Sequence, residues 1–298
     1  MKIAIIGPGA IGSLFALTLD ASGVQVALFQ RQLGSVTRNY VGPLNLAKQS
    51  ITFAHKRTDI AKADLVLCCV KAWQLSDALA QFSPYFHAKQ PIILSHNGMG
   101  ALSETHPLFT HHPIFALTTT HGAMLDAGEL KHTGLGQCIL GPLNPLAVTQ
   151  QRIAQSLCEY LNHANMDAHV DLEIEQRLWQ KLLINCIINP LTARDQCPNG
   201  ALANPQYQDE IATLIKEAWQ VTQREGLPWT PQAIDAQIMA VVKATAANFS
   251  SMNRDLANQR RTEIDAITGF LLQRGALHGV SLPHHQQLYH QIQSKECR

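Results

Sequence analysis

A short apolar strand, a glycine-rich turn and a helix open the chain, and they restrict its fold more than any other feature. Residues 3–6 form a continuous apolar run, as in strands buried on both faces of a parallel sheet. The turn Gly7-Pro8-Gly9-Ala10-Ile11-Gly12 follows at once, and apolar residues then recur at helical spacing as far as Ala21. A second apolar strand covers residues 24–29. This order of elements predicts a βαβ unit and a parallel sheet.

The three glycines of the turn match the requirements of a dinucleotide site. Gly7 suits a tight turn, Gly9 lets a pyrophosphate approach the backbone, and Gly12 lets the helix pack closely on the strand. The start of the helix offers N–H groups and positive partial charge to phosphates. We predict a Rossmann-type domain, with a turn that binds no ligand as the alternative. The predicted cofactor-binding residues of the turn are Gly7, Pro8, Gly9, Ala10, Ile11 and Gly12.

The residues after the second strand indicate which dinucleotide binds. NAD sites usually carry an Asp or Glu there, which binds the ribose 2′-hydroxyl. This chain has Gln30-Arg31-Gln32, and the first acidic residue after Val24 is Asp59. Arg31 can pair with a 2′-phosphate, and a hydrogen bond to a charged group contributes about 1.5–3 kcal/mol. The sequence therefore predicts NADP(H), and a solvated surface arginine is the alternative.

Further apolar runs extend the predicted sheet. They cover residues 64–70, 91–95 and 114–117, and alternating segments at 129–133 and 137–140 predict a sheet of mixed direction, followed by a helix over 146–162. Ligands of open α/β sheets bind beyond the carboxyl ends of strands. Lys71 follows the first of these runs and Asn97 the second, so both are candidates for the site. The alternatives are an exposed charge for Lys71 and a turn residue before a glycine for Asn97.

The second half of the chain has a different pattern. Strand signals stop near Asp171, and helical periodicity covers residues 172–188, 206–225, 231–249, 253–273 and 284–294. This change predicts an α/β chain with a dinucleotide-binding domain over residues 1–170 and an all-α domain over residues 171–298. No low-complexity linker separates them, so we expect close packing.

One helix of the second half carries three regularly spaced polar residues. Lys181, Asn185 and Asn189 fall on one stripe of a predicted helix that is apolar nearly all round and should be buried, with Pro190 just past its end. A buried amide without a partner costs about 2–7 kcal/mol. The three side chains therefore either find partners within the protein or bind a small polar ligand, and their common spacing favours the ligand.

Two more polar groups stand out in the helical half. Ser251 lies in a predicted break between helices, where a hydroxyl and N–H groups suit a carboxylate, although helix capping explains it equally well. Glu263 lies on the next predicted helix, and an ion pair with Arg260 or Arg261 is the alternative to a role in a site.

Composition excludes several classes of protein. Of the 298 residues, 46% are hydrophobic and 15% charged, and the formal net charge is +1, so neither disorder nor a nucleic-acid surface is expected. No apolar run reaches the roughly 18 residues of a membrane span. The apolar N-terminus breaks at Gly7-Pro8-Gly9 without a convincing cleavage site, so we expect a strand and not a signal peptide.

Cysteine and histidine spacing gives two further expectations. The 14 His show no metal-ligand spacing, so no metal site is expected. The seven Cys include no CxxC pair and favour reduced thiols in a cytoplasmic protein. They are Cys68, Cys69, Cys138, Cys158, Cys186, Cys197 and Cys297.

In order and spacing, the motifs resemble those of the ketopantoate reductase (2-dehydropantoate 2-reductase) family over nearly the whole chain. Beyond the glycine turn, they are Lys71-Ala72-Trp73-Gln74, His96-Asn97-Gly98-Met99-Gly100, Trp179 with Lys181-Leu182, Asn185-Cys186, Asn189-Pro190-Leu191-Thr192-Ala193, Cys197-Pro198-Asn199-Gly200, Ser250-Ser251-Met252 and Thr262-Glu263-Ile264-Asp265. The departures are Pro8 within the turn and Arg194-Asp195-Gln196 before Cys197, and neither falls on a matched functional position.

This resemblance implies NADPH-dependent reduction of 2-dehydropantoate to (R)-pantoate, a step towards pantothenate and coenzyme A. It implies that Lys181 is the catalytic lysine, also in contact with the substrate, and that Glu263 lies where cofactor and substrate meet. The implied substrate contacts are Asn97, Asn185, Asn189, Asn199 and Ser251, and the implied cofactor contacts outside the turn are Lys71, Asn97, Ala123 and Glu263.

The chemistry of the residues agrees with that reaction. Hydride addition to a ketone leaves an alkoxide that needs a proton, and a lysine in an apolar cleft can have its pKa lowered towards neutral pH. Lys181 is therefore expected to be the general acid, with Glu263 orienting the reacting groups. A reductase of another branched 2-keto acid and a non-catalytic NADPH-binding sensor remain as alternatives. Both a monomer and a homodimer are compatible with the sequence.

Overall fold

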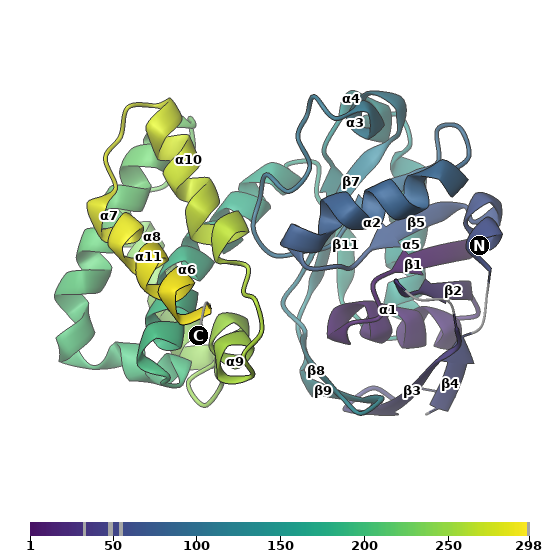
Figure 1. The fold of residues 1–298 in the computed structure, drawn as a ribbon, viewed down its shortest axis with the longest axis horizontal. Coiled ribbons are helices and arrows are strands. Elements are labelled where there is room, and N and C mark those ends of the chain that lie inside the picture. The colour runs from purple at the N-terminus through teal and green to yellow at the C-terminus, as the bar shows by residue number, and fades with distance from the viewer. Residues whose placement is uncertain (32–33, 47–49, 54–55, 297–298) are drawn as a thin grey trace. The chain divides into compact units, whose positions relative to one another are not determined.

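The computed structural model describes residues 1–31, 34–46, 50–53 and 56–296. The chain forms two compact units: residues 1–96 with 101–175, and residues 97–100 with 176–298. All strands of the described chain belong to the first unit, and the second is helical (Figure 1). The α/β and all-α classes are thus confirmed. The predicted domain boundary at 170/171 stays a prediction, and the compact units divide at 175/176.

The first unit contains eleven strands within the described residues, and several short helices. The strands are β1 (Lys2–Ile6), β2 (Gln25–Phe29), β3 (Val36–Val41), β4 (Ser50–Phe53), β5 (Leu65–Cys68), β6 (Ile92–Leu94), β7 (Ile114–Thr119), β8 (Gly122–Asp126), β9 (Glu129–Gly134), β10 (Cys138–Pro142) and β11 (Ala168–Val170). The helices are α1 (Ala10–Ala21), α2 (Leu75–Phe82), α3 (Pro107–His111), α4 (Pro145–Val148) and α5 (Gln151–His163), with 3₁₀ segments η1 (Arg57–Lys62), η2 (Ala72–Gln74) and η3 (Ser83–Tyr85).

Seven strands form the main sheet, in the order β11-β10-β7-β6-β5-β1-β2. β10 and β7 are antiparallel neighbours, and the remaining neighbours are parallel, which confirms the mixed direction. The prediction placed 129–133 in the same sheet, and this is wrong. That segment is β9, which joins a second sheet of order β4-β3-β9-β8.

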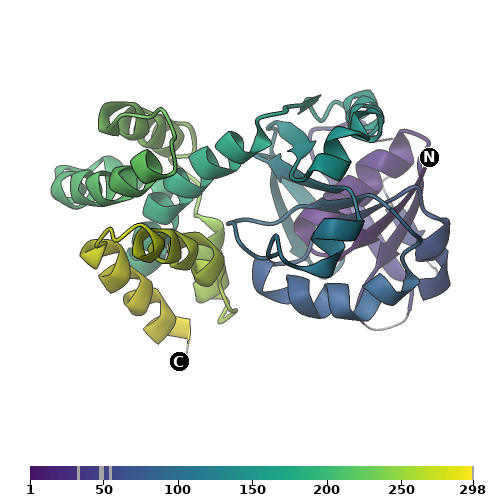
Figure 2. The same cartoon turned by 90° about the horizontal axis from the view of Figure 1, so that it is seen from above.

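Alternation along the central strands produces two separate cores. In β1, Ile3 and Ile5 pack into a core that also contains α1 and α5, whereas Ala4 and Ile6 pack into another with α2. Figure 2 shows α1 and α2 on opposite sides of the main sheet. Because side chains point to alternate faces, a parallel strand covered on both sides must be apolar throughout, as β5 is and as β1 is from Ile3 to Ile6.

Helices make up the second unit. They are α6 (Ile174–Asp195), α7 (Gln208–Arg224), α8 (Pro231–Ala244), α9 (Ser251–Ala257), α10 (Phe270–Leu277) and α11 (Pro283–Glu296), with 3₁₀ segments η4 (Asn199–Ala203) and η5 (Pro205–Tyr207) and a π-helical segment η6 (Asp265–Gly269). Two predicted ranges are wrong: 231–249 ends at Ala244, and 253–273 is broken between α9 and η6.

The helix α6 runs through Pro190 to Asp195, so the prediction that Pro190 follows its end is wrong. A proline inside a helix removes one hydrogen bond and costs about 3 kcal/mol. Here the flanking residues Ile188 and Leu191 are buried in the core of the unit, and the Thr192 hydroxyl donates to the Ile188 carbonyl at 2.7 Å. Tertiary packing therefore outweighs the local preference for a stop.

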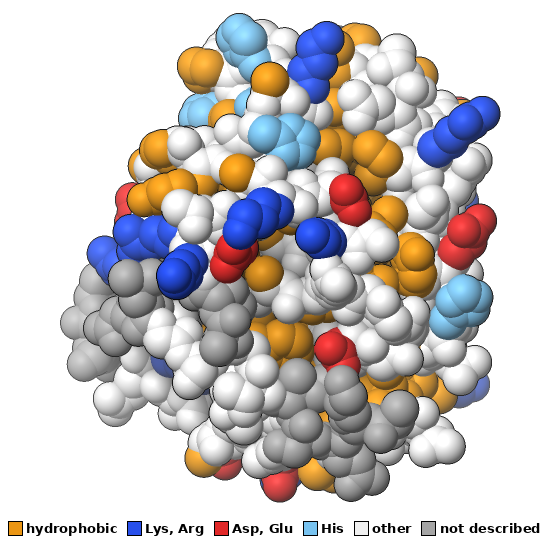
Figure 3. Space-filling view, turned by 90° about the vertical axis from the view of Figure 1, so that its right-hand side faces the viewer, with side chains coloured by type: hydrophobic (Ala, Val, Ile, Leu, Met, Phe, Trp, Pro, Cys, Tyr) orange, Lys and Arg blue, Asp and Glu red, His pale blue; other side chains and the backbone are white. Residues whose placement is uncertain are grey.

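The structure also bears on the predicted absences. No helix within residues 1–31, 34–46, 50–53 and 56–296 is long and apolar enough to cross a membrane. The same residues contain no His, Cys, Asp or Glu group arranged to hold a metal ion. Six cysteines are free thiols, and Cys297, like Gln32, lies outside the described residues. On the face drawn in Figure 3, acidic and basic side chains lie among uncharged ones.

Candidate active site

Backbone sterics shape the glycine turn between β1 and α1. Gly7 has φ +106°, which favours glycine, and its N–H donates to the Phe29 carbonyl at 3.0 Å. A Cβ on Gly12 would lie 2.0 Å from the Gly7 carbonyl oxygen. The protein's own packing therefore requires glycine at both positions.

Gly9 differs from its two neighbours in the turn. It has φ −68°, which any residue can adopt, and a Cβ there would meet no atom of the described residues within 4 Å. Gly9 is also the N-cap of α1, where no side chain caps the helix and no acidic residue occupies the first turn. Nothing inside the described chain explains this glycine, whereas a pyrophosphate over the exposed helix N-terminus would. The turn therefore fits a dinucleotide.

Arg31 follows β2, and its side chain is exposed. Its backbone carbonyl accepts hydrogen bonds from Gln81 Nε2 at 3.1 Å and from Arg57 Nη2 at 3.4 Å. The guanidinium of Arg57 in turn lies 5.7 Å from the centre of the Phe82 ring. The main chain at Arg31 is thus held by side chains of α2 and η1, while its own side chain is exposed.

Lys71 and Ala123 lie in different parts of the first unit. Lys71 is half-buried and begins η2, where its N–H donates to Gln74 Oε1 at 3.2 Å. Lys71 thus lies at a helix entry, as its alternative expects, but is half-buried, and its cofactor contact stays a prediction. Ala123 lies in β8, a strand that the sequence did not predict, beside a register irregularity with β9.

Asn97 and Glu263 meet in the second unit, although 166 residues separate them along the chain. Asn97 Nδ2 donates to Glu263 Oε2 at 3.1 Å, and Glu263 is 5% exposed. The next residue, Gly98, has φ +82°, and a Cβ there would lie 2.2 Å from the Ala266 carbonyl oxygen. Asn97 thus precedes a glycine turn, as its alternative expects, and its amide contacts the predicted acid, while its contacts with cofactor and substrate stay predictions.

The predicted polar stripe lies on α6. Lys181 and Asn185 are half-buried, and Asn189 is buried with 6% exposure. Their neighbours Leu182 and Cys186 are buried completely or nearly so. The stripe is therefore half-buried at its first two members and buried at the third, instead of being buried throughout as predicted.

Ser250, and not Ser251, is the N-cap of α9. Its hydroxyl accepts from the Asn253 N–H at 3.1 Å and lies 2.8 Å from Thr192 Oγ1 of α6. Ser251 is exposed, and its hydroxyl makes no hydrogen bond within the described residues. The capping alternative therefore applies to the neighbouring serine and leaves the predicted substrate contact of Ser251 open to a ligand.

Asn199 carries a polar atom that the described protein leaves unpaired. Its Nδ2 donates to Thr245 Oγ1 at 2.8 Å, and its N–H donates to the Asn248 carbonyl at 2.8 Å. Its Oδ1 is buried and has no hydrogen-bond partner among the described residues. An unpaired buried acceptor costs about 1–3 kcal/mol, so a hydroxyl or amine from a ligand would stabilise this site.

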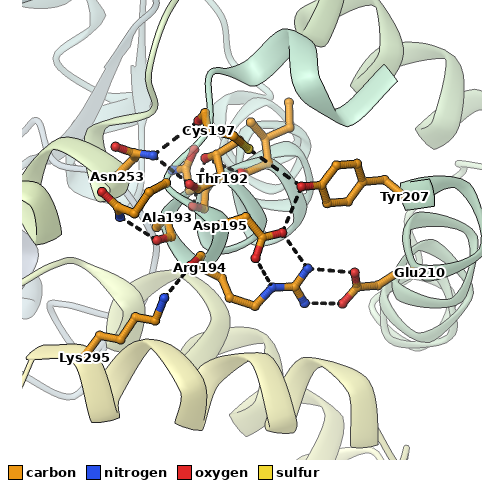
Figure 4. A network of polar contacts seen from close by, with 12 residues as sticks. Thr192, Ala193, Arg194, Asp195, Cys197, Tyr207, Glu210, Asn253 and Lys295 are labelled. Atoms are coloured by element: carbon orange, nitrogen blue, oxygen red, sulfur yellow. Dashed lines mark hydrogen bonds and ion pairs between the residues drawn. The ribbon is translucent and has the colours of Figure 1, made fainter. Parts of the chain in front are cut away.

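A network of charged residues fixes the chain between Asn189 and Asn199 (Figure 4). Arg194 bonds to both oxygens of Asp195, at 2.8 and 2.9 Å, and to both oxygens of Glu210, at 2.6 and 3.0 Å. Tyr207 donates to Asp195 at 2.9 Å. Hydrogen bonds from Arg194 lower the pKa of Asp195, and burial raises the pKa of Tyr207 to about 12.

Asn253 ties the same segment to the start of α9. Its Nδ2 donates to the Thr192 carbonyl at 2.6 Å and to the Cys197 carbonyl at 3.3 Å (Figure 4). The departure at Arg194-Asp195-Gln196 therefore belongs to the framework that positions predicted substrate residues. No local sequence pattern signals this network, because its partners come from separate elements of the chain.

The structure also shows an unpredicted side chain against the glycine turn. Arg38 of β3 donates from Nη2 to the Pro8 carbonyl at 2.8 Å and from Nε to Ser13 Oγ at 2.7 Å. A single arginine in a strand that the sequence did not reveal gave no local signal for this contact.

Chain-wide comparisons agree with this arrangement. The family described as ketopantoate reductase PanE/ApbA matches residues 3–145, and ketopantoate reductase PanE/ApbA C terminal matches residues 173–296. A 2-dehydropantoate 2-reductase from Vibrio cholerae is 40% identical over 99% of this chain and 98% of its own.

Two solved structures are similar over nearly their full length. D-mandelate dehydrogenase with NADH and anilino(oxo)acetate has a TM-score of 0.85 at 25% identity, covering 99% of this chain and 98% of that one. A dimeric ketopantoate reductase from Staphylococcus aureus has a TM-score of 0.83 at 24% identity, covering 99% of both, and shows the shared fold. By these matches, the chain belongs to the ketopantoate reductase family of oxidoreductases.

Proposed function

We propose that this protein reduces 2-dehydropantoate to (R)-pantoate, with NADPH as the hydride donor. The observation that carries the proposal is the stripe Lys181, Asn185 and Asn189 on α6, which resembles the family motif and lies within the matched residues 173–296. The 40% identity to a 2-dehydropantoate 2-reductase over the whole chain supports the same substrate. Its product would be used in pantothenate and coenzyme A synthesis.

Both backbone groups of the glycine turn and charged side chains would hold the cofactor. The turn residues Gly7 to Gly12 would take the pyrophosphate, Arg31 the 2′-phosphate, and Lys71, Ala123, Asn97 and Glu263 the remaining contacts. When bound, the nicotinamide supplies the hydride. We expect Arg31→Ala to raise the Michaelis constant for NADPH much more than that for NADH. An equal effect on both would contradict the preference for NADPH.

The substrate would be held by amides and hydroxyls. Asn185, Asn189 and Ser251 offer N–H and O–H donors for the carboxylate. The unpaired Oδ1 of Asn199 is an acceptor and suits the distal hydroxyl of the substrate, which a simple 2-keto acid lacks. This acceptor therefore supports a hydroxylated substrate.

Lys181 would supply the proton. After hydride addition, its ammonium group donates a proton to the alkoxide oxygen, and the carboxylate of Glu263 orients the reacting groups with the help of Asn97. We expect Lys181→Ala to reduce kcat by about 10²–10⁴-fold. Lys216→Ala, which removes an exposed lysine of α7, is the matched control and should leave kcat unchanged. Near-full turnover in Lys181→Ala would refute this role.

A substrate panel tests the proposed reaction directly. NADPH oxidation would be followed by absorbance with 2-dehydropantoate, pyruvate, 2-ketoisovalerate and 2-ketoisocaproate, with NADH in parallel. Fast turnover confined to 2-dehydropantoate with NADPH is expected. NADPH binding without turnover on any keto acid would instead indicate a non-catalytic sensor.

One observation favours a second candidate, a reductase of another 2-keto acid. The solved structure of D-mandelate dehydrogenase with NADH and anilino(oxo)acetate matches this chain at a TM-score of 0.85. Turnover of benzoylformate or a branched 2-keto acid faster than that of 2-dehydropantoate, or a preference for NADH, would select this alternative.

The state of the cysteines bears on the compartment in which the protein works. Five of the six described free cysteines are buried and the sixth is half-buried, which supports a reducing, cytoplasmic compartment.

We keep monomer and homodimer as the two proposed oligomeric states, and sedimentation of the purified protein would distinguish them.

A further inference from the structure

We infer that Arg38 is a further cofactor-binding residue, which supplies positive charge to the dinucleotide pyrophosphate at the glycine turn. The inference rests on the proposed function, because it needs a dinucleotide bound at residues 7–12. Arg38 lies in β3 of the small second sheet, outside the βαβ unit that forms the turn.

Three hydrogen bonds hold the Arg38 guanidinium in place. Nη2 donates to the Pro8 carbonyl at 2.8 Å, Nε to Ser13 Oγ at 2.7 Å, and Nη1 to the Thr37 carbonyl at 2.8 Å. Ser13 is fully buried, and its hydroxyl also donates to the Pro8 carbonyl at 3.1 Å. An arginine has five N–H donors, so two remain beyond these three bonds.

Within the part of the chain that the structure describes, no acidic side chain neutralises the charge of this guanidinium. All three acceptors are uncharged oxygens, and no carboxylate pairs with Arg38 among the described residues. Burial lowers the pKa of Arg38, without a neighbouring acid to raise it. A half-buried cation without a counter-ion is unfavourable in isolation, and an anion beside it would offset that cost.

The location identifies the kind of anion. Arg38 contacts Pro8, the residue between Gly7 and Gly9, and Ser13, the fourth residue of α1. The open space at Gly9 and the uncapped start of α1 belong to the same few residues. Phosphates are favoured at such a helix N-terminus, and a fixed guanidinium adds charge-assisted hydrogen bonds.

Arg38 and Arg31 should therefore recognise different phosphates of one cofactor. This separation gives a binding test that needs no turnover. Titration calorimetry would measure four ligands: NADPH, NADH, ADP-ribose, which has the pyrophosphate only, and adenosine 2′-monophosphate, which has the 2′-phosphate only. The proteins would be the wild type, Arg38→Met, Arg38→Lys and Arg31→Ala.

We expect Arg38→Met to lower the affinity for NADPH, NADH and ADP-ribose by a similar factor of about 10 or more. The affinity for adenosine 2′-monophosphate should stay unchanged. Arg38→Lys, which keeps the charge, should lose less affinity for these three ligands. Arg31→Ala should show the opposite pattern, with losses confined to the two ligands that carry a 2′-phosphate. Lys131→Met, which removes an exposed cation from the neighbouring strand β9, is the matched control and should bind all four normally.

Salt dependence separates charge recognition from mere support of the turn. If Arg38 binds phosphate, ADP-ribose affinity should fall less steeply with added salt in Arg38→Met than in the wild type. An unchanged slope, an equal loss for all four ligands, or no loss for ADP-ribose would overturn the inference. If the wild type binds no dinucleotide, the proposed function itself fails. Should Arg38→Met not fold, Arg38→Gln, which also removes the charge but keeps a polar side chain, provides the same test of affinity and salt slope.

Discussion

The glycine turn and the end of α6 are both parts of the proposed machinery, but they are built in opposite ways. The turn takes its shape from the backbone, since Gly7 and Gly12 are required by contacts with main-chain atoms only a few residues or one strand away. The end of α6 takes its shape from side chains, with Arg194 bonded to acids of two elements. A backbone-built site should fail when a methyl group is added, and a side-chain-built site when a charge is removed.

The largest expected effect is at Gly12. In Gly12→Ala the new Cβ would lie 2.0 Å from the Gly7 carbonyl oxygen, so the turn or the helix has to move. We expect a loss of roughly 3 kcal/mol in the free energy of unfolding, together with loss of dinucleotide binding. Urea unfolding followed by circular dichroism would measure the first, and calorimetric titration the second.

The matched change at Gly9 should separate folding from binding. Among the residues placed by the structure, none has an atom within 4 Å of a methyl group in Gly9→Ala, and φ −68° suits alanine. Stability should therefore stay within about 0.5 kcal/mol of the wild type, while affinity for NADPH falls. A Gly9→Ala protein that binds NADPH normally would contradict the assignment of this turn to the pyrophosphate.

The next effect in size is at Arg194. Arg194→Met removes hydrogen bonds to Asp195 and Glu210, and we expect a loss of about 1–3 kcal/mol in the free energy of unfolding. The Michaelis constant for the keto acid should also rise, because the segment leading to Asn199 is released. Arg260→Met removes a 60% exposed partner of Asp255 and should cost less than about 1 kcal/mol. Equal losses in the two variants would show that the network contributes no more than a surface ion pair.

The smallest expected effect tests whether side-chain networks also matter in the first unit. His132 is buried, with Nε2 3.0 Å from His121 Nδ1 and Nδ1 3.0 Å from the Tyr40 hydroxyl. Burial and then the neighbouring His121 lower the pKa of His132. The stability it contributes is present above the unfolded pKa of about 6.5 and is lost as pH falls through the lower folded value.

His132→Gln removes this titration while keeping a neutral amide. The melting temperature of the wild type should therefore fall more steeply between neutral pH and about pH 5 than that of the variant. Thermal unfolding at a series of pH values measures both slopes. Parallel curves would mean that His132 does not titrate differently in the folded and unfolded protein.

The same contrast explains what could be predicted from the sequence. The glycine turn, the strands around it and the class of each half depend on local spacing, and these expectations agree with the structure. The stop at Pro190 failed because buried neighbours such as Ile188 and Leu191 keep α6 intact. The second sheet was not predicted, because β3 and β9 pair in parallel although they are far apart along the chain. In addition, the pattern of β3 mixes polar and apolar residues.

In the candidate site, too, local spacing predicted some features and tertiary packing determines the others. The position of Lys181, Asn185 and Asn189 on one helix came from spacing alone, whereas their differing burial depends on the packing of the whole unit. The contact of Asn97 with Glu263 joins segments 166 residues apart, and no local pattern encodes it. Likewise, the unpaired Oδ1 of Asn199 became visible only once its surroundings were known.

The segment 97–100 has a consequence for any attempt to cut this protein in two. It lies between stretches that fold with the sheet, yet it packs with the helices, through Met99 N–H to the Ala266 carbonyl at 2.9 Å. The polypeptide therefore passes from one unit to the other at residues 96/97, 100/101 and 175/176. A helical fragment that begins at residue 176 would lack Asn97. Two co-expressed halves would therefore have to bring residues 97–100 back to the helices before they could act as one enzyme.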